Sequence, residues 1–263
     1  MERLVLIKLG GSLITDKSID RTSRPGTICR LAGELKKIRK TFDGKILVAH
    51  GAGSFAHRPA VEFRVKDGIK GPLQFKGFPI VADRAIELNR IIIKNFLDQK
   101  LPAVSFSPES CILASNFKVE EVFCVPIEQA LKVGYIPVLY GDVIFDKKVG
   151  ACIYSTELVL GALAGKLAKK FRISFVYCTD TDGVFDSTGK TLPEINHKNI
   201  KEVEKFITGS GQIDVTGGMV HKVRESLAMA DKGFETIIIN GNRPNELSKA
   251  ILGDKHHGTH IRY

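Results

Sequence analysis

The sequence predicts an α/β fold in which helices cover both faces of a mainly parallel central sheet. Short apolar runs rich in valine and isoleucine recur along the chain, and longer segments with helical periodicity separate most of them. Strands that alternate with helices form parallel sheets, because each helix carries the chain back to the edge where the next strand starts. The 263 residues are 43% hydrophobic and 26% charged, which suits one large domain or two closely joined lobes.

The expected elements follow one another in a regular order. Strands are expected at 4–9, 45–50, 102–106, 136–140, 173–178 and 236–240, and helices at 28–39, 80–97, 158–169 and 219–232. Two apolar runs in 141–155 flank a polar turn and predict a hairpin. A division near residue 170 separates residues 1–170, which carry the first glycine motifs, from residues 171–263, within one continuous domain.

Charge and composition exclude several classes of function. The net charge of +10 favours an anionic substrate, but the lysines are spread along the chain and aromatic residues do not alternate with basic ones, so we expect no nucleic-acid binding. Without a run of about 18 apolar residues or a signal-peptide layout, we expect no membrane association and a cytoplasmic location. Five scattered cysteines without metal-ligand spacing predict buried, reduced thiols and no metal-ligating side chains.

The first motif with chemical potential is KLGGSLITDK at 8–17. Lys8 ends an expected strand, Gly10, Gly11 and Ser12 follow as a turn, and Lys17 brings a second ammonium group. Glycines let the backbone approach a phosphate closely, lysines neutralise its charge, and parallel sheets bind ligands at the carboxyl ends of their strands. Taken alone, a tight turn with exposed lysines explains this motif equally well.

The second motif, HGAGSFAH at 50–57, places another glycine turn between a strand and a helix. Unpaired N–H groups converge at such a helix start, where the helix dipole is positive, so this turn predicts an anion site. His57 is near enough to donate a hydrogen bond to the anion. Taken alone, a surface histidine in a first helical turn is the simpler interpretation, and we expect His50 to be packed or hydrogen-bonded.

Two further motifs lie in the second half of the chain. TDTDGV at 179–184 supplies carboxylates that can orient a ribose, a metal or lysines, although Asp and Gly are also ordinary turn residues. DVTGGMVHK at 214–222 opens a helix, and Lys222 can fold back onto an anion at the helix start. The alternative there is a threonine cap beside a solvated lysine. Three glycine turns, each with a basic residue in reach, together indicate a phosphate site.

In this order the motifs resemble those of the amino acid kinase superfamily, and within it those of the isopentenyl phosphate kinases. The similarity runs from Lys8 to GTHI at 258–261, and the histidine that ends the second turn is its specific signal. It is carried by K-x-G-G-S at 8–12, H-G-x-G-S-F-x-H at 50–57, Gly-Asp at 141–142, T-D-x-D-G-V at 179–184 and D-x-T-G-G-M-x-x-K at 214–222.

The resemblance implies an open αβα sandwich that uses ATP and Mg²⁺ to convert isopentenyl phosphate into isopentenyl diphosphate for isoprenoid biosynthesis. Residues 1–170 would bind the phosphate acceptor, residues 171–263 would bind the nucleotide, and the chain would form a homodimer. Fosfomycin kinases share the histidine, so a kinase of another small phosphate or phosphonate is the alternative.

The resemblance also assigns roles to residues. The catalytic residues would be Lys8, Lys17, His57 and Lys222. The acceptor phosphate would meet Ala52, Gly53, His57 and Ser155, and its prenyl chain would meet Phe78, Val81, Val143 and Ile153. The ATP-binding residues would be Lys8, Leu9, Gly10, Gly11, Ser12, Gly53, Asp180, Gly217, Gly218 and Lys222.

Some positions depart from the family pattern. Ala52 and Ala56 replace glycines, and alanine disfavours a positive φ. In YSTEL at 154–158, Ser155 stands for a glycine that touches the acceptor phosphate, and Thr156 stands for an aspartate that orients the catalytic lysines. Glu157 can take over from that aspartate, although one residue along a helix turns a side chain by about 100°. A nucleotide-binding homologue with impaired catalysis is therefore a third hypothesis.

Overall fold

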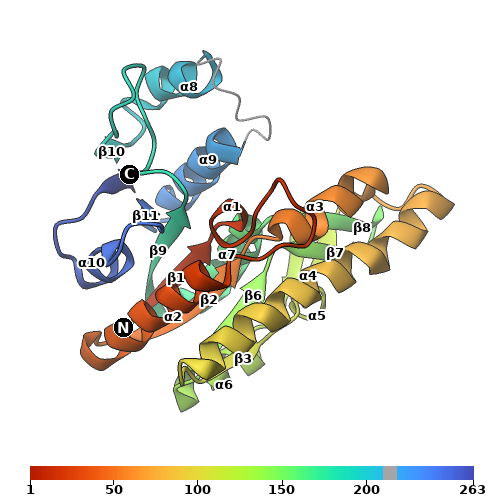
Figure 1. The fold of residues 1–263 in the computed structure, drawn as a ribbon. Helices are drawn as coiled ribbons and strands as arrows, with labels where there is room; N and C mark the ends of the chain where they lie inside the picture. The colour runs from red at the N-terminus through yellow and green to blue at the C-terminus, as the bar shows by residue number, and fades with distance from the viewer. Residues whose placement is uncertain (210–217) are drawn as a thin grey trace.

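The computed structural model describes residues 1–209 and 218–263, and the side chains outside 206–218 (Figure 1). Its main feature is an eight-stranded sheet in the order β10-β12-β11-β9-β1-β2-β6-β3. All neighbours in this sheet are parallel except β11 and β12. Its strands are β1 Glu2–Leu9, β2 Lys45–His50, β3 Ala103–Ser105, β6 Ile136–Tyr140, β9 Phe171–Thr179, β10 Glu194–Ile195, β11 Thr236–Asn240 and β12 Gly258–Ile261.

Helices cover both faces of this sheet, and strand β1 shows why. Its Leu4 and Leu6 point into one apolar core, while Val5 and Ile7 point into the other, because successive side chains of a strand face opposite sides. The first core includes side chains of α6 Val125–Val133, α7 Thr156–Leu167 and α9 Gly218–Ala230. The second includes side chains of α1 Gly11–Ile14, α2 Pro25–Thr41, α4 Pro72–Asp98 and α10 Glu246–Leu252. The expected α/β sandwich is confirmed.

A smaller, four-stranded sheet in the order β5-β4-β7-β8 lies beside the large one. Its strands β7 Asp142–Asp146 and β8 Gly150–Tyr154 form the expected hairpin. The helix α3 Gly53–Glu62 packs on α4, and this pair extends away from the large sheet at the right of Figure 1. The other elements are β4 Ile112–Ser115, β5 Lys118–Val122, α5 Pro108–Cys111, α8 Ile200–Gly209 and the 3₁₀ turn η1 Val65–Asp67.

Some expected boundaries were wrong. Helix α4 begins at Pro72, well before residue 80, because Pro72 occupies a first-turn position where its missing N–H costs nothing, and Pro79 lies inside the helix. Strands β4 and β5 were not expected, since β5 is exposed and carries no buried apolar run. Cys29 is exposed, which corrects the expectation that all five thiols are buried; the other four are.

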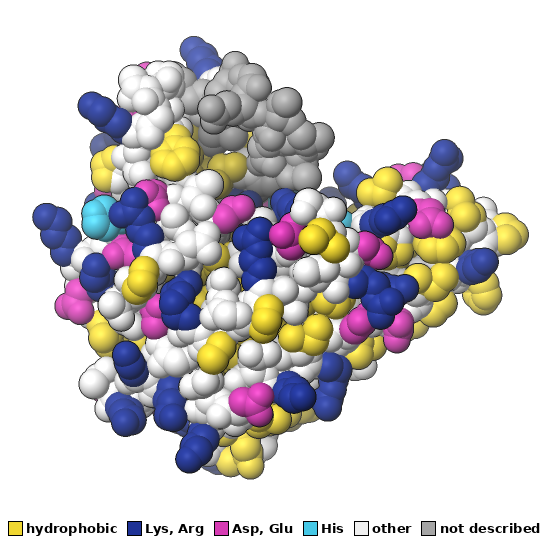
Figure 2. Space-filling model, in the orientation of Figure 1, with side chains coloured by type: hydrophobic (Ala, Val, Ile, Leu, Met, Phe, Trp, Pro, Cys, Tyr) yellow, Lys and Arg dark blue, Asp and Glu magenta, His cyan; other side chains and the backbone are white. Residues whose placement is uncertain are grey.

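The distribution of basic side chains and the polarity of the helices indicate which other molecules the chain can contact. Basic side chains are scattered over the face shown in Figure 2 and do not gather in one stripe. No helix among the described residues is both long enough and apolar enough to cross a membrane. Strand β1 of residues 1–170 pairs with strand β9 of residues 171–263, so the two segments share one large sheet. The division of roles between them stays a prediction.

Candidate active site

Four strands of the large sheet end directly before a glycine, and these glycines lie along its carboxyl edge. Each glycine N–H donates to a carbonyl at the end of a neighbouring strand, which fixes the start of each turn. The bonds are Gly10 to Cys178 (2.9 Å), Gly51 to Leu9 (2.9 Å), Gly141 to His50 (3.0 Å) and Gly241 to Thr179 (2.8 Å). Gly241 was not singled out in the sequence, although it too follows an apolar run.

The two predicted glycine turns touch each other through their backbones. A Cβ atom on Gly11 would lie 2.7 Å from the nitrogen of Gly53, so neither turn tolerates a side chain at this contact. Gly53 has a φ of +52° and faces the Thr15 side chain, where a Cβ atom would overlap it. Gly10 precedes α1, which contains Ser12, and Gly53 opens α3. The structure therefore brings both turns into one site.

The alanines that replace family glycines fit without strain. Ala52 precedes α3 with φ −72° and ψ −21°, a right-handed conformation that alanine adopts readily. Ala56 lies inside α3 and is buried. Only Gly53 in this turn needs a positive φ, and it is a glycine. The expected backbone cost of the two alanines is thus absent.

Lys8 lies on the α7 side of β1 and forms a buried ion pair with Glu157 in the first turn of α7. Only 6% of each residue is exposed. The Lys8 ammonium also lies 5.8 Å from the centroid of the Tyr177 ring. Burial of Glu157 opposes its ionisation, but the charge and hydrogen bond of Lys8, its own backbone N–H and the charge of Lys222 together hold its pKa below the ordinary value.

Lys222 belongs to the same group of charges. It lies in α9, and its ammonium contributes to the lowered pKa of Glu157. Helices α7 and α9 pack against each other, which carries the two residues together although 65 positions separate them in the chain (222 − 157). Glu157 therefore pairs with Lys8 of β1 and lies close enough to Lys222 of α9 for that charge to lower its pKa.

Thr156, which stands where the family has an aspartate, holds the start of α7 in this structure. Its hydroxyl donates to the His50 carbonyl at 2.9 Å, and only 2% of the residue is exposed. It packs against Gly141, where a Cβ atom would lie 2.8 Å from Thr156 Oγ1. Thr156 thus ties the start of α7 to the end of β2, and Glu157, one residue on, is the carboxylate that meets Lys8. The sequence motif alone does not show which of these two neighbouring side chains points toward Lys8, because that depends on how α7 is rotated against β1.

His57 and Lys17 are both exposed, and Lys17 and Lys8 are close enough to His57 to act on its charge. Partial burial and then the positive charges of Lys17 and Lys8 lower the pKa of His57. Lys17 is exposed on a loop between residues 15 and 23, whose ends form a β-bridge. Two hydrogen bonds from Arg21 to Glu87 of α4, of 2.6 and 3.0 Å, pin this loop beside α3 and α4.

His50 is a structural residue, as expected. It is fully buried, stacks on Tyr140 with ring centroids 5.5 Å apart, and accepts a hydrogen bond from Asn89 (3.2 Å) on Nε2. Its Nδ1 then donates to the Gly51 carbonyl at 3.1 Å. Burial lowers the pKa of His50 to about 4, so the ring is neutral near neutral pH. This bonding positions the second glycine turn.

An apolar cluster lies directly behind the His57 turn. It joins side chains of α3, α4, β6, β7, β8 and η1, separate from the two main cores. The expected prenyl-pocket residues Phe78, Val81, Val143 and Ile153 all belong to it, and so do Ala52 and Ala56 of the turn. Phe78 also contacts Phe145, with ring centroids 5.0 Å apart. The four residues are therefore adjacent in space although they span 76 positions (153 − 78 + 1) of the chain.

The remaining candidate residues lie toward β9 and β11. Asp180 follows β9 and is exposed, and Gly218 is the first residue of α9. Gly217 lies outside the described residues. Ser155 caps α7 by accepting from the Leu158 N–H at 3.3 Å, and its hydroxyl is 3.5 Å from His221 Nε2. His221 was not picked out from the sequence, although it precedes Lys222.

Asp182, the second carboxylate of the TDTDGV motif, has side-chain partners at this edge. Asp182 accepts a hydrogen bond from Asn240 (2.8 Å) and pairs with Arg243, so it ties the turn after β9 to the turn after β11. Its partner Asn240 was not picked out from the sequence, although Asn240 and Gly241 end an apolar run just as His50 and Gly51 do. Asp180 therefore remains as the exposed carboxylate of the TDTDGV motif.

The fold and the site define a class of protein: an α/β phosphotransferase with lysines and glycine turns at the carboxyl edge of its sheet. A model of the amino acid kinase family matches residues 3–240. The chain therefore belongs to the amino acid kinase family.

Within this family the chain is similar to isopentenyl phosphate kinases. The curated isopentenyl phosphate kinase of Methanocaldococcus jannaschii is 31% identical, with 99% of both chains covered. That of Methanothermobacter thermautotrophicus is 31% identical, with 98% of both chains covered. A crystal structure of an isopentenyl phosphate kinase superposes with a TM-score of 0.83 at 27% identity, covering 98% of this chain and all of the other. The resemblance found in the motifs is confirmed.

Proposed function

We propose that the protein transfers the terminal phosphoryl group of ATP to isopentenyl phosphate and so forms isopentenyl diphosphate. The observation that carries this proposal is the apolar cluster that packs behind the His57 turn, with Lys8 and Lys17 close enough to lower the pKa of His57. Such a site matches a molecule with a charged phosphate at one end and a short hydrocarbon chain at the other. The relatives named isopentenyl phosphate kinase support the same acceptor.

In this proposal the acceptor phosphate lies at the start of α3. His57 donates to one of its oxygens, the backbone of Ala52 and Gly53 approaches it, and the hydrocarbon chain enters the apolar cluster. An ionised phosphate oxygen is already a nucleophile, so the reaction needs no general base. The partial burial that lowers the pKa of His57 also strengthens its hydrogen bond to a bound anion.

Lys8, Lys17 and Lys222 supply the positive charge that the transferring phosphoryl group needs. In phosphoryl transfer, alignment and charge stabilisation account for most of the catalysis. Glu157 holds Lys8 at a fixed place before the substrates bind, and Lys222 is near enough to lower the pKa of Glu157. The hydrogen bonds of Arg21 to Glu87 fix the loop that carries Lys17.

The nucleotide would lie toward β9 and β11, with its phosphates against Gly10, Gly11 and Ser12 and near Asp180 and Gly218. The described residues contain no cluster of three His, Cys, Asp or Glu side chains that could hold a metal. Asp180 is exposed at this edge and is the carboxylate that would help to hold a Mg²⁺ ion brought by ATP. When bound, the ion would neutralise charge on the phosphates.

The alternative acceptor, a small phosphonate such as fosfomycin, requires a small polar pocket. The cluster behind His57 is instead lined by Phe78, Val81, Val143 and Ile153. The hypothesis of impaired catalysis rests on Thr156 in place of an aspartate, and the ion pair of Glu157 with Lys8 supports an active enzyme instead. We further propose a cytoplasmic location. We also propose a homodimer, and sedimentation velocity of the purified chain tests that oligomeric state.

An ATP-coupled assay of the purified protein tests the proposal. Isopentenyl phosphate, dimethylallyl phosphate and fosfomycin are compared side by side at equal concentration. We expect turnover with both prenyl phosphates and a kcat/KM for fosfomycin lower by at least roughly 100-fold, since it cannot fill the apolar cluster. Faster turnover of fosfomycin would reject isopentenyl phosphate as the acceptor, and silence with all three would reject the kinase.

A further inference from the structure

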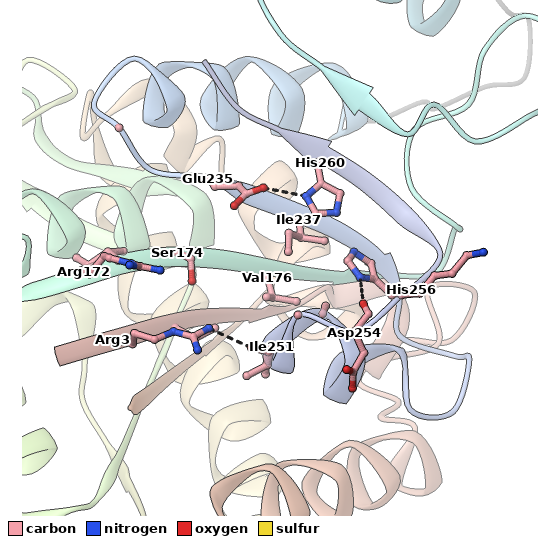
Figure 3. A pocket seen from close by; sticks show the side chains of 16 residues that line it. Arg3, Arg172, Ser174, Val176, Glu235, Ile237, Ile251, Asp254, His256 and His260 are labelled. Atoms are coloured by element: carbon pink, nitrogen blue, oxygen red, sulfur yellow. Dashed lines mark hydrogen bonds and ion pairs between the residues drawn. The ribbon is translucent and has the colours of Figure 1, made fainter. Parts of the chain in front are cut away.

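A second pocket, of about 630 Å³, lies at the opposite edge of the large sheet from the glycine turns (Figure 3). Its walls come from the starts of β1, β9 and β11, from β12 and from the end of α10 with the loop that follows. Arg3 of this pocket and Lys8 of the active site are five positions apart in β1, so about 16 Å of strand separates them. The pocket therefore shares no reacting group with the active site.

Basic side chains surround this pocket. Arg3, Arg172 and Lys255 line it, and none of them forms an ion pair with a carboxylate among the described residues. The guanidinium of Arg3 lies 4.8 Å from the centroid of the Phe42 ring and donates to the Ile251 carbonyl at 3.3 Å, so it is held at the rim. Three cations without counter-ions at one pocket favour an anionic ligand.

Two histidines add donors to the same wall. His256 and His260 lie with ring centroids 5.0 Å apart (Figure 3). His260 Nδ1 pairs with Glu235 at 2.8 Å, which leaves the carboxylate of Asp254 as the other negative group of the pocket. His256 Nδ1 donates to the Asp254 carbonyl at 2.9 Å, while its buried Nε2 has no partner among the described side chains. The pocket wall thus contains a buried polar atom that no described side chain satisfies.

The inner part of the pocket is apolar. Val5, Val176 and Ile237 come from neighbouring strands of the sheet, and Ala250 and Ile251 come from α10. A ligand that fits both parts carries its charge at one end and a hydrocarbon group at the other. We propose that this pocket is a second, non-catalytic site for an organic phosphate or diphosphate ester with a short apolar chain. Such a ligand binds outside the active site, so the inference goes beyond the transfer reaction itself.

Isothermal titration calorimetry with isopentenyl diphosphate as the probe tests this proposal. Four proteins are compared: the wild type, the pocket variant Arg172→Gln/Lys255→Gln, the active-site variant Lys17→Met/His57→Ala and a control. The control, Lys36→Gln/Lys94→Gln, removes two exposed lysines elsewhere and so makes the same change in net charge. Melting curves confirm that each variant is folded.

We expect two binding sites per chain in the wild type and the control. The pocket variant should weaken one site by roughly tenfold or more, and the active-site variant should weaken the other. A pocket variant that binds as the wild type does would overturn the second site. An active-site variant that binds as the wild type does would instead count against the proposed function, so the two failures differ.

Inorganic pyrophosphate tests the apolar part of the inference. In the active-site variant we expect it to bind the remaining site more weakly than isopentenyl diphosphate, because it buries no hydrocarbon against Val5 and Ile237. Equal affinity for the two probes would contradict a ligand with an apolar chain. The second site would then be one for the anion alone.

Discussion

Replacing Glu157 by glutamine removes the carboxylate that holds Lys8 and leaves the shape of the side chain almost unchanged. Both residues are 6% exposed, so the Lys8 ammonium keeps its charge in a buried place without a counter-ion. Lys8 then loses its fixed position relative to the phosphoryl group. We expect kcat to fall about 100-fold, equivalent to about 2.7 kcal/mol of transition-state stabilisation, with a small change in KM for ATP.

The same substitution has a predicted pH signature in stability. Since the pKa of Glu157 is lowered in the folded protein, its stabilising contribution is fully present above the ordinary value of 4.5 and is lost as the pH falls through the lowered folded value. Glutamine does not titrate. Urea unfolding should therefore show a wild-type advantage of about 3 kcal/mol at neutral pH that disappears in acid.

Steady-state kinetics with isopentenyl phosphate and ATP measures the effect on kcat. Glu157→Asp keeps the charge on a shorter side chain and should recover part of the lost kcat, which a purely structural role for Glu157 would not produce. The reasoning is refuted if Glu157→Gln turns over at the wild-type rate, or if Glu157→Asp and Glu157→Gln are equally impaired.

Three further substitutions test the site. His57→Ala should lower kcat/KM for the acceptor by about 1.5–3 kcal/mol and leave the KM for ATP in place; steady-state kinetics in which the KM for ATP rises and acceptor kinetics hold would contradict its assignment. Lys17→Met keeps the aliphatic stem and should lower kcat by roughly 100- to 1,000-fold with an unchanged melting curve, and near-normal turnover would argue against the charge role. Thr156→Asp places a carboxylate against the His50 carbonyl, so unfolding should show a loss of about 2 kcal/mol and no gain in kcat; a higher kcat would restore Thr156 as the lysine-orienting position.

Much of the fold could be predicted from the sequence because its strands are buried on both faces. β1, β2, β6, β9 and β11 are continuous apolar runs, and the helices between them repeat apolar residues on one side. Strands β4 and β5 were not predicted. β5 forms by pairing with β4 and buries little of its own surface, so its sequence contains no buried apolar run. The start of α4 was missed because Pro79 looks like a helix boundary, whereas Pro72 is one.

The site was predictable where its chemistry is local. The glycine turns, Lys8, Lys17 and His57 follow strands, and parallel strands bring their carboxyl ends to one edge. Glu157 and Thr156 show the limit. They are neighbours in sequence, yet one meets Lys8 and the other the His50 carbonyl, because a helix turns by about 100° per residue. Only the register of α7 against β1 and β2 distinguishes them.

Phosphorus NMR of the purified protein with ATP, Mg²⁺ and isopentenyl phosphate tests the central claim most directly. The account predicts that the monophosphate signal of the acceptor disappears while two coupled diphosphate signals grow, and that ADP forms in equal amount. Formation of ADP with the monophosphate signal unchanged would contradict the claim, since the phosphoryl group would then pass to water or to another acceptor.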